Sequence, residues 1–159
     1  MGFIEPLLSF SLKSRADKHL FTTQNNQNIP AIGNVEYRLE AQTNYFVHCF
    51  SSNYTLREFD DFEADTCIVI REPMTLVKRM MSCFEQYKQF YRGFASGVKY
   101  IDPLNAKPDE VNIFFTKHFK YSYQNEYRTI WLPNAPTLDL EPFFIEIGNM
   151  SKYAEIVRI

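Results

Sequence analysis

The chain has 159 residues, of which 45% are hydrophobic and 16% are aromatic, and its formal net charge is −2. This composition excludes a disordered chain, and the length is typical of one domain with a sizeable core. The slight negative charge, without any run of lysines or arginines, gives no support to nucleic-acid binding, which usually needs a basic face. We therefore expect a single domain over residues 1–159.

The cysteines and the apolar runs indicate the compartment. Cys49, Cys67 and Cys83 are odd in number and lack Cys-x-x-Cys spacing, which disfavours a disulfide framework and a zinc site. We expect reduced, buried thiols. No apolar run approaches the roughly 20 residues of a membrane span, and the first residues lack the order of a secretory signal. These features favour a cytoplasmic protein.

The N-terminal third is the least regular part of the sequence. Residues 3–12 are apolar, and Pro6 limits them to an edge strand or an extended arm. Residues 14–21 are compatible with a short helix. Residues 22–33, rich in Thr, Gln and Asn, predict an exposed polar loop that is too short to link two domains.

Three strands are predicted next. Residues 35–40 alternate apolar and polar side chains, which predicts a half-buried strand. Residues 45–50 are apolar nearly throughout and predict a central strand. Residues 66–70 are short and β-branched, which favours another buried strand. Between the last two, residues 55–65 predict a loop with one helical turn.

A long helix is predicted after Pro73, since proline is favoured at the first helical position. Its apolar side chains recur every three or four residues and form one stripe. The stripe comprises Leu76, Met80, Phe84, Tyr87 and Tyr91. We expect this helix to end at Gly93.

The last third predicts short elements. Residues 97–101 and 126–132 predict strands that end before Pro103 and at Pro133. Residues 109–121 remain ambiguous between helix and strand. Residues 142–147 predict a further strand, and a helical turn near Tyr153 precedes a closing strand over residues 156–159.

Strands dominate this pattern, and they are joined by one long helix and two or three short helices. No internal repeat and no alternation of strands with long helices is visible. The sequence therefore predicts an α+β domain with a mostly antiparallel sheet.

Glu126 and Arg128 stand two positions apart in a predicted strand, so both point to the same face. Gln124 joins them if the strand begins early enough. Two interpretations stay open. The residues are an ion-paired structural ladder on a solvent face, or they are the remains of a catalytic site.

Several short motifs follow one another in a recognisable order over residues 35–157. They are a strand ending in Cys49-Phe50-Ser51, the acidic and aromatic residues 56–65, the apolar strand 67–70, Val98-Lys99-Tyr100, Lys117, the run Gln124-Asn125-Glu126-Tyr127-Arg128, and Ile145-Glu146-Ile147-Gly148. This order resembles a widespread, poorly characterised bacterial and phage domain family. That family is thought to resemble the ADP-ribosyltransferase fold, with its basic residue, its serine-containing strand and its Gln/Glu-x-Glu pair.

The resemblance implies a transferase site with NAD as the cofactor. Glu126 would hold a ribose hydroxyl and stabilise the cationic transition state. Gln124 would position the acceptor, Arg38 would hold the pyrophosphate, and Ser51 would contact the ribose on the nicotinamide side.

A second candidate site is the segment from Arg57 to Asp65, in which five carboxylates occur within eight positions around two aromatics. The candidate partner-binding residues are Glu58, Phe59, Asp60, Asp61, Phe62, Glu63 and Asp65. Such a surface suits a protein that blocks a basic active site, because carboxylates mimic phosphates and accelerate encounter with cations. The alternative is a solvated acidic loop with both phenylalanines turned inward.

The histidines add no catalytic set, because no Ser-His-Asp or Cys-His arrangement follows from their spacing. His48 lies within a predicted buried strand, and we expect a hydrogen-bonded core histidine.

Three functions follow from these features. We expect foremost a non-catalytic binding protein of the immunity type, without cofactor, that neutralises a cognate bacterial toxin with a basic domain, for example a nuclease. It would contact neither nucleic acid nor membrane directly. The alternative is an ADP-ribosyltransferase-like enzyme or its NAD-binding relic. A third is a phage or defence accessory protein that binds another small ligand.

Overall fold

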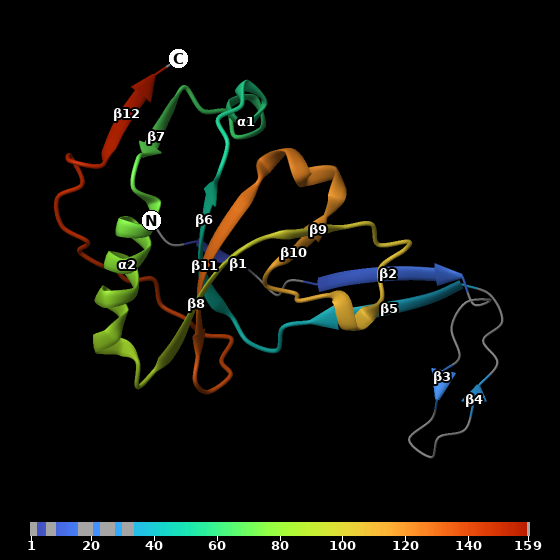
Figure 1. Cartoon of the computed structure of the whole chain (residues 1–159). Coiled ribbons are helices and arrows are strands. Elements are labelled where there is room, and N and C mark those ends of the chain that lie inside the picture. Colours follow the sequence, from blue (N-terminus) through green and yellow to red (C-terminus); the bar gives the residue numbers. More distant parts are fainter. Residues whose placement is uncertain (1–2, 6–8, 16–20, 23–27, 30–33, 159) are drawn as a thin grey trace. The chain divides into compact units, whose positions relative to one another are not determined.

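The computed structural model describes residues 3–5, 9–15, 21–22, 28–29 and 34–158 (Figure 1). These residues form mostly antiparallel strands, one long α-helix and several short helices, which confirms the predicted α+β class. The chain divides into two compact units. The first comprises Met1–Pro6, Gln42–Gly97 and Gln124–Ile159, and the second comprises Leu7–Ala41 and Val98–Tyr123. The single domain expected over residues 1–159 stays a prediction.

A four-stranded antiparallel sheet is the centre of the first unit. Its strands, in order across the sheet, are β1 (Phe3–Glu5), β6 (Tyr45–Ser51), β11 (Glu126–Pro133) and β8 (Tyr91–Gly97). Trp131 of β11 lies opposite Phe46 on one side and Gly93 on the other. The predicted strands at 45–50 and 126–132 are thus confirmed, and their apolar runs place both in the middle of the sheet.

Helix α2 (Pro73–Phe84) covers the face of the sheet that carries Trp131. Proline stands in its first turn, as predicted. The Phe84 ring stacks on the Trp131 indole with centroids 4.1 Å apart. The buried cluster comprises Phe46, Leu76, Met80, Phe84, Trp131 and Tyr153. Each such side chain stabilises the fold by about 1.5–3 kcal/mol on burial.

The predicted end of this helix is wrong. The α-helix stops at Phe84, and the 3-10 helix η2 (Glu85–Tyr87) follows it. Tyr91 and Gly93 instead belong to β8, which pairs with β11. A Cβ atom on Gly93 would lie 3.0 Å from Met81 Sδ and 3.2 Å from Trp131 Nε1. This glycine therefore allows close packing within the sheet and does not cap a helix.

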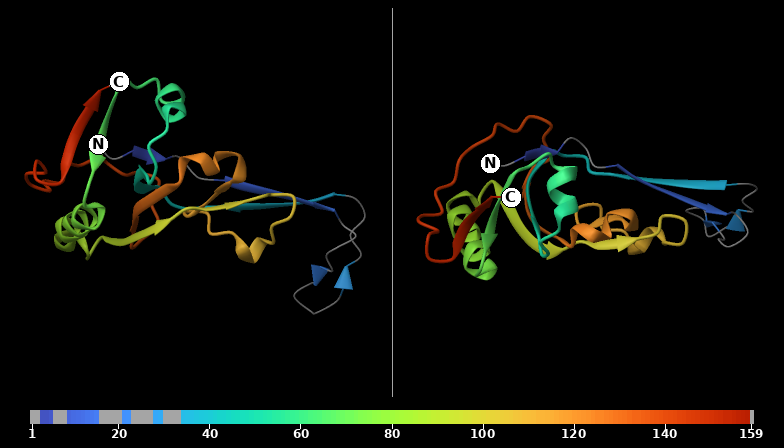
Figure 2. Two further views of the ribbon diagram at one scale, coloured as in Figure 1. Left: turned by 45° about the horizontal axis from the view of Figure 1, so that its top comes forward. Right: turned by 90° about the horizontal axis from the view of Figure 1, so that it is seen from above.

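A second, two-stranded antiparallel ladder completes the regular structure of the first unit. It joins β7 (Thr66–Ile70) to β12 (Ala154–Arg158), and the two strands lie side by side in Figures 1 and 2. The short helix α1 (Leu56–Asp61) precedes β7. The predicted helical turn in 55–65, the strand at 66–70 and a closing strand near the C-terminus are confirmed.

The strand predicted over residues 142–147 is not present. Phe143, Ile145 and Ile147 pack against the core, but the segment joins no ladder among the described residues. Its carbonyls are bonded by side chains of α2. Cys83 Sγ donates to Glu146 O at 3.2 Å, and Arg79 Nη1 donates to Ile147 O at 3.3 Å.

The described residues of the second unit form three two-stranded ladders and two short 3-10 helices. The antiparallel ladders are β2 (Ser9–Arg15) with β5 (Asn34–Glu40), and β3 (Phe21–Thr22) with β4 (Asn28–Ile29). The parallel ladder joins β9 (Lys99–Ile101) to β10 (Thr116–His118). One 3-10 helix is η3 (Pro108–Glu110). A further 3-10 helix, η4 (Phe119–Gln124), runs toward β11.

These elements decide the remaining predictions for the second unit. The strand at 35–40 is confirmed. Ser14 and Arg15 of the predicted helix 14–21 lie in β2, and residues 16–20 lie outside the described residues. Most of the predicted loop 22–33 also lies outside them, apart from Thr22 and β4. No helix among the described residues is long and apolar enough to span a membrane.

Candidate functional site

The acidic segment, defined here as residues 56–65, consists of α1 and the turn that leads into β7. Thr55 precedes the helix in an extended conformation, and the chain reverses at Glu63, whose φ is 49°. The Ala64 amide donates to Phe59 O at 2.9 Å, which closes the turn. Local backbone bonds thus hold the segment in a defined shape.

The two phenylalanines of this segment have opposite environments. Phe59 is buried and makes an edge-to-face contact with Tyr54, with ring centroids 5.4 Å apart. Phe62 is 68% exposed. Leu56 and Tyr54 are also exposed, which sequence reasoning missed because a short loop has no periodicity to assign its faces. The interpretation with both phenylalanines turned inward holds for Phe59 alone.

The predicted carboxylates stand before and after Phe62 in the segment, and most of them are exposed. Asp60, Asp61, Glu63 and Asp65 are exposed, and Glu58 is half-buried. Arg57 Nε lies 3.6 Å from Asp61 Oδ2, and Asp65 Oδ1 accepts a hydrogen bond from Thr66 Oγ1 at 2.8 Å. Exposed contacts of this kind stabilise by about 1 kcal/mol at most, so they do not prevent these groups from meeting a partner.

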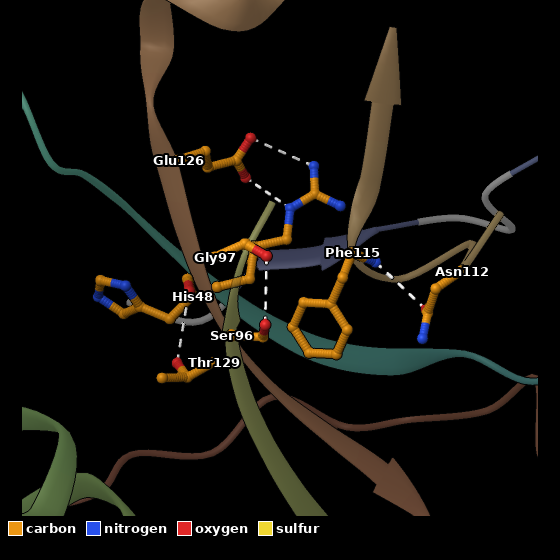
Figure 3. Close-up of polar contacts among 8 residues, drawn as sticks. His48, Ser96, Gly97, Asn112, Phe115, Glu126 and Thr129 are labelled. Atoms are coloured by element: carbon orange, nitrogen blue, oxygen red, sulfur yellow. Dashed lines mark hydrogen bonds and ion pairs between the residues drawn. The ribbon is translucent and has the colours of Figure 1, made fainter. Parts of the chain in front are cut away.

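Glu126 and Arg128 form an ion pair within β11 (Figure 3). Arg128 Nε lies 2.6 Å from Glu126 Oε1, and Arg128 Nη2 lies 3.3 Å from Glu126 Oε2. The Arg128 side chain is only 5% exposed and the Glu126 side chain only 7%. The prediction that they share a face is confirmed, but the expectation of a solvent face is wrong. Both carboxylate oxygens of Glu126 are engaged with its neighbour.

Ser51 and Gln124 lie close to this pair. Ser51 stands opposite Glu126 in the ladder between β6 and β11. Its hydroxyl lies 2.7 Å from Asn53 O and 2.9 Å from Gln124 O. Gln124 ends η4, and Asn125, with φ 38°, separates it from β11. Gln124 therefore does not continue the strand face that carries Glu126. Strand β11 begins only at Glu126, too late to include Gln124.

Arg38, the fourth residue of the implied transferase set, lies in β5 of the second unit. Its side chain is exposed, and its guanidinium pairs with the Glu40 carboxylate. The first unit by itself assembles Ser51, Gln124 and Glu126.

The imidazole of His48, in β6, has a lowered pKa. Burial lowers its pKa, and its ring stacks on Phe50 with centroids 4.5 Å apart. Its Nδ1 is buried and has no hydrogen-bond partner in the described part of the chain, while a hydrogen bond with the Cys49 main chain partly offsets the lowering of the pKa. Its carbonyl accepts from Thr129 Oγ1 at 3.3 Å (Figure 3).

The described residues contain no group of three or more histidine, cysteine or acidic side chains that could hold a metal. The expectation of buried thiols is wrong, because Cys49 is exposed and Cys67 and Cys83 are half-buried. A cavity of about 540 Å³ in the first unit is lined mainly by Tyr87, Phe90, Tyr91, Pro133 and Phe143. It shares no lining residue with the acidic segment or with the Glu126 group.

No protein-family model matches the chain, and neither a curated protein nor a solved structure matches it significantly.

Proposed function

We propose that this chain is a non-catalytic binding protein of the immunity type, which neutralises a cognate bacterial toxin through its acidic segment. The observation that carries the proposal is the position of Phe62. Its ring is largely exposed and is flanked by Asp60, Asp61 and Glu63. Large exposed apolar groups framed by charge are typical of interaction surfaces.

The two kinds of side chain contribute differently to recognition. An aromatic such as Phe62 buries a large area when it enters a partner's pocket, and such anchors carry most of an interface's binding energy. The surrounding carboxylates act earlier, because they attract a basic surface over a distance and orient it. The partner that fits is a basic toxin domain, such as a nuclease whose cations normally contact phosphates.

The segment is also suited to binding because it is held in place before a partner arrives. Phe59 and Tyr54 anchor α1, and the bond from the Ala64 amide to Phe59 O fixes the turn. A prearranged surface loses less conformational entropy on association than a loop that must become ordered. No cofactor is part of this role.

The state of Glu126 supports a binding role over a catalytic one. A transferase glutamate must offer its carboxylate to a ribose hydroxyl and to developing positive charge. Here both oxygens of the Glu126 carboxylate contact Arg128, and the side chain is buried. This arrangement suits an internal structural pair.

The proposal is tested by capture from a lysate of the source organism, followed by association kinetics with the purified captured protein. Charge reversal of Glu58, Asp60, Asp61 and Glu63 to lysine should slow association at low salt by about tenfold or more. The matched control reverses four exposed acidic residues outside the segment, Asp109, Glu110, Glu141 and Glu146, and should associate faster than the first variant. Equal association rates for wild type and the first variant would remove the acidic segment from the interface.

A second candidate function is an ADP-ribosyltransferase-like enzyme or an NAD-binding relic, supported by the proximity of Ser51, Gln124 and Glu126. Calorimetric titration with NAD separates the two roles. The binding role predicts no heat with wild type. Binding that is lost in Ser51→Ala and retained in the neighbouring control Ser52→Ala would favour the second candidate.

A further inference from the structure

Strand β8 lies at the edge of the four-stranded sheet. Within the described residues it pairs with β11 alone, so its other side carries main-chain donors and acceptors without a ladder partner. Such an edge is a template for another strand.

The hydrogen-bond pattern identifies which residues face this open side. The Asn134 amide donates to Phe90 O at 2.7 Å, in register with the β8–β11 ladder. In an antiparallel pair the bonded positions alternate, so Arg92, Phe94 and Ser96 direct their main-chain groups toward β11. The outward positions are Tyr91, Gly93, Ala95 and Gly97. Pro133, which has no N–H, stands opposite the outward-facing Tyr91, as this alternation requires.

The outward positions of β8 carry no proline and no charged side chain. Proteins usually protect an edge strand with proline, lysine or a bulge, and β8 has neither residue and pairs in continuous register. Three of its four outward positions carry at most a methyl group. Gly97 O accepts a bond from Ser96 Oγ at 3.2 Å, and a carbonyl oxygen retains a second lone pair for a partner.

We propose that β8 pairs antiparallel with β8 of a second copy of this chain, about a two-fold axis at Phe94, so that the two sheets join into one. This register places Gly93 opposite Ala95 of the second copy, and Tyr91 opposite its Gly97. All four are outward-facing positions, so each pair can exchange two main-chain hydrogen bonds. A two-fold interface requires such a self-complementary surface.

The side chains are complementary in the same register. Phe94, which is 43% exposed, meets Phe94 of the second copy across a close, non-hydrogen-bonded pair, where aromatic contacts are favourable. Arg92 faces Ser96 of the second copy and lies diagonal to its Phe94, within reach of a cation–π contact. No like charges stand directly opposite, and the large Tyr91 ring faces a glycine.

The contact area predicts a reversible dimer. Seven strand residues make a contact roughly 24 Å long and about 10 Å thick. This is smaller than the roughly 800 Å² per partner of a stable complex, so association should depend on concentration. The interface shares no residue with the acidic segment, and it is independent of the proposed toxin-binding role.

Sedimentation velocity of the purified chain over a range of concentrations tests this dimer. Wild type should shift from monomer toward dimer as concentration rises. Phe94→Lys places two like charges opposite each other and should remain monomeric. The matched control, Phe90→Lys, changes a phenylalanine that is 57% exposed but precedes β8, and it should dimerise as wild type does.

A backbone variant tests the strand pairing itself. Ala95→Pro removes an outward N–H without removing a bond to β11, and it should also abolish the dimer. Circular dichroism verifies that each variant is folded. The proposal is overturned if wild type is monomeric at every concentration, or if folded Phe94→Lys dimerises as strongly as Phe90→Lys.

Discussion

The Arg128 guanidinium contacts both carboxylate oxygens of Glu126, two residues earlier on the same buried strand. The alternation of side chains in a strand places the two residues on one face, and burial makes each the necessary counter-charge of the other. The resemblance to transferases would imply a catalytic role for Glu126. Its ion pair with Arg128 and its burial are the observations that favour the proposed non-catalytic role.

Removal of one member of this ion pair should strongly destabilise the fold. Glu126→Gln leaves the Arg128 charge buried with a weaker partner, and it should lower the free energy of unfolding by about 3–5 kcal/mol. The double variant Glu126→Gln with Arg128→Met should lose clearly less free energy of unfolding than the two single variants lose in sum. Urea denaturation of all four proteins measures the coupling. Additive losses would show that the two side chains do not stabilise each other.

The two glycines of β8 should differ in their tolerance of a methyl group. Gly93→Ala forces a Cβ atom to within 3.0 Å of Met81 Sδ, and such overpacking costs about 1–3 kcal/mol. Gly97→Ala meets no atom within 4 Å and should leave stability nearly unchanged. Thermal melting of dilute protein compares the two. Equal melting temperatures would contradict the close approach of Trp131 to β8.

The two phenylalanines of the acidic segment should separate stability from binding. Phe59→Ala removes a buried ring and should destabilise by about 3 kcal/mol. Phe62→Ala changes an exposed side chain and should alter stability by less than about 0.5 kcal/mol while weakening partner binding. Denaturation curves and dissociation rates test both statements. A large stability loss in Phe62→Ala would show that its ring is not on the surface.

Acid should destabilise the protein partly through His48. Burial lowers the pKa of this side chain, so the unfolded chain binds its proton more readily than the folded chain. Neutral His48 therefore makes its full contribution to the free energy of unfolding above the ordinary histidine pKa near 6.5. This contribution declines as the pH falls below that value. For this one group, the free energy of unfolding changes by at most about 1.4 kcal/mol per pH unit.

The variant His48→Phe tests this contribution, because a phenyl ring can keep the stack on Phe50 and cannot titrate. From neutral to mildly acidic pH, the free energy of unfolding should fall less in the variant than in wild type. An identical decline in both proteins would place the acid sensitivity elsewhere.

The sequence predicts those elements whose own side chains determine them. The apolar runs at β6 and β11 and the β-branched run at β7 identify central or buried strands without knowledge of their partners. The same reasoning fails at Tyr91, which continues the helical stripe of α2 although it begins β8. Its pairing with a strand some forty residues later is a non-local contact, which short-range periodicity does not contain.

The candidate site shows the same limit. The face shared by Glu126 and Arg128 follows from strand geometry, but their burial depends on tertiary packing. Residues 142–147 are mostly apolar like a strand, yet they join no ladder, and side chains of α2 bond the carbonyls of Glu146 and Ile147. Likewise, no local pattern distinguishes the buried Phe59 from the exposed Phe62, because α1 has only six residues.

Hydrogen–deuterium exchange of the chain, alone and in complex with the captured partner, shows whether the acidic segment binds that partner. We expect slower exchange on binding at the amides of α1 and the following turn, residues 56–65. Protection confined to β6 and β11, with unchanged exchange in α1, would contradict it.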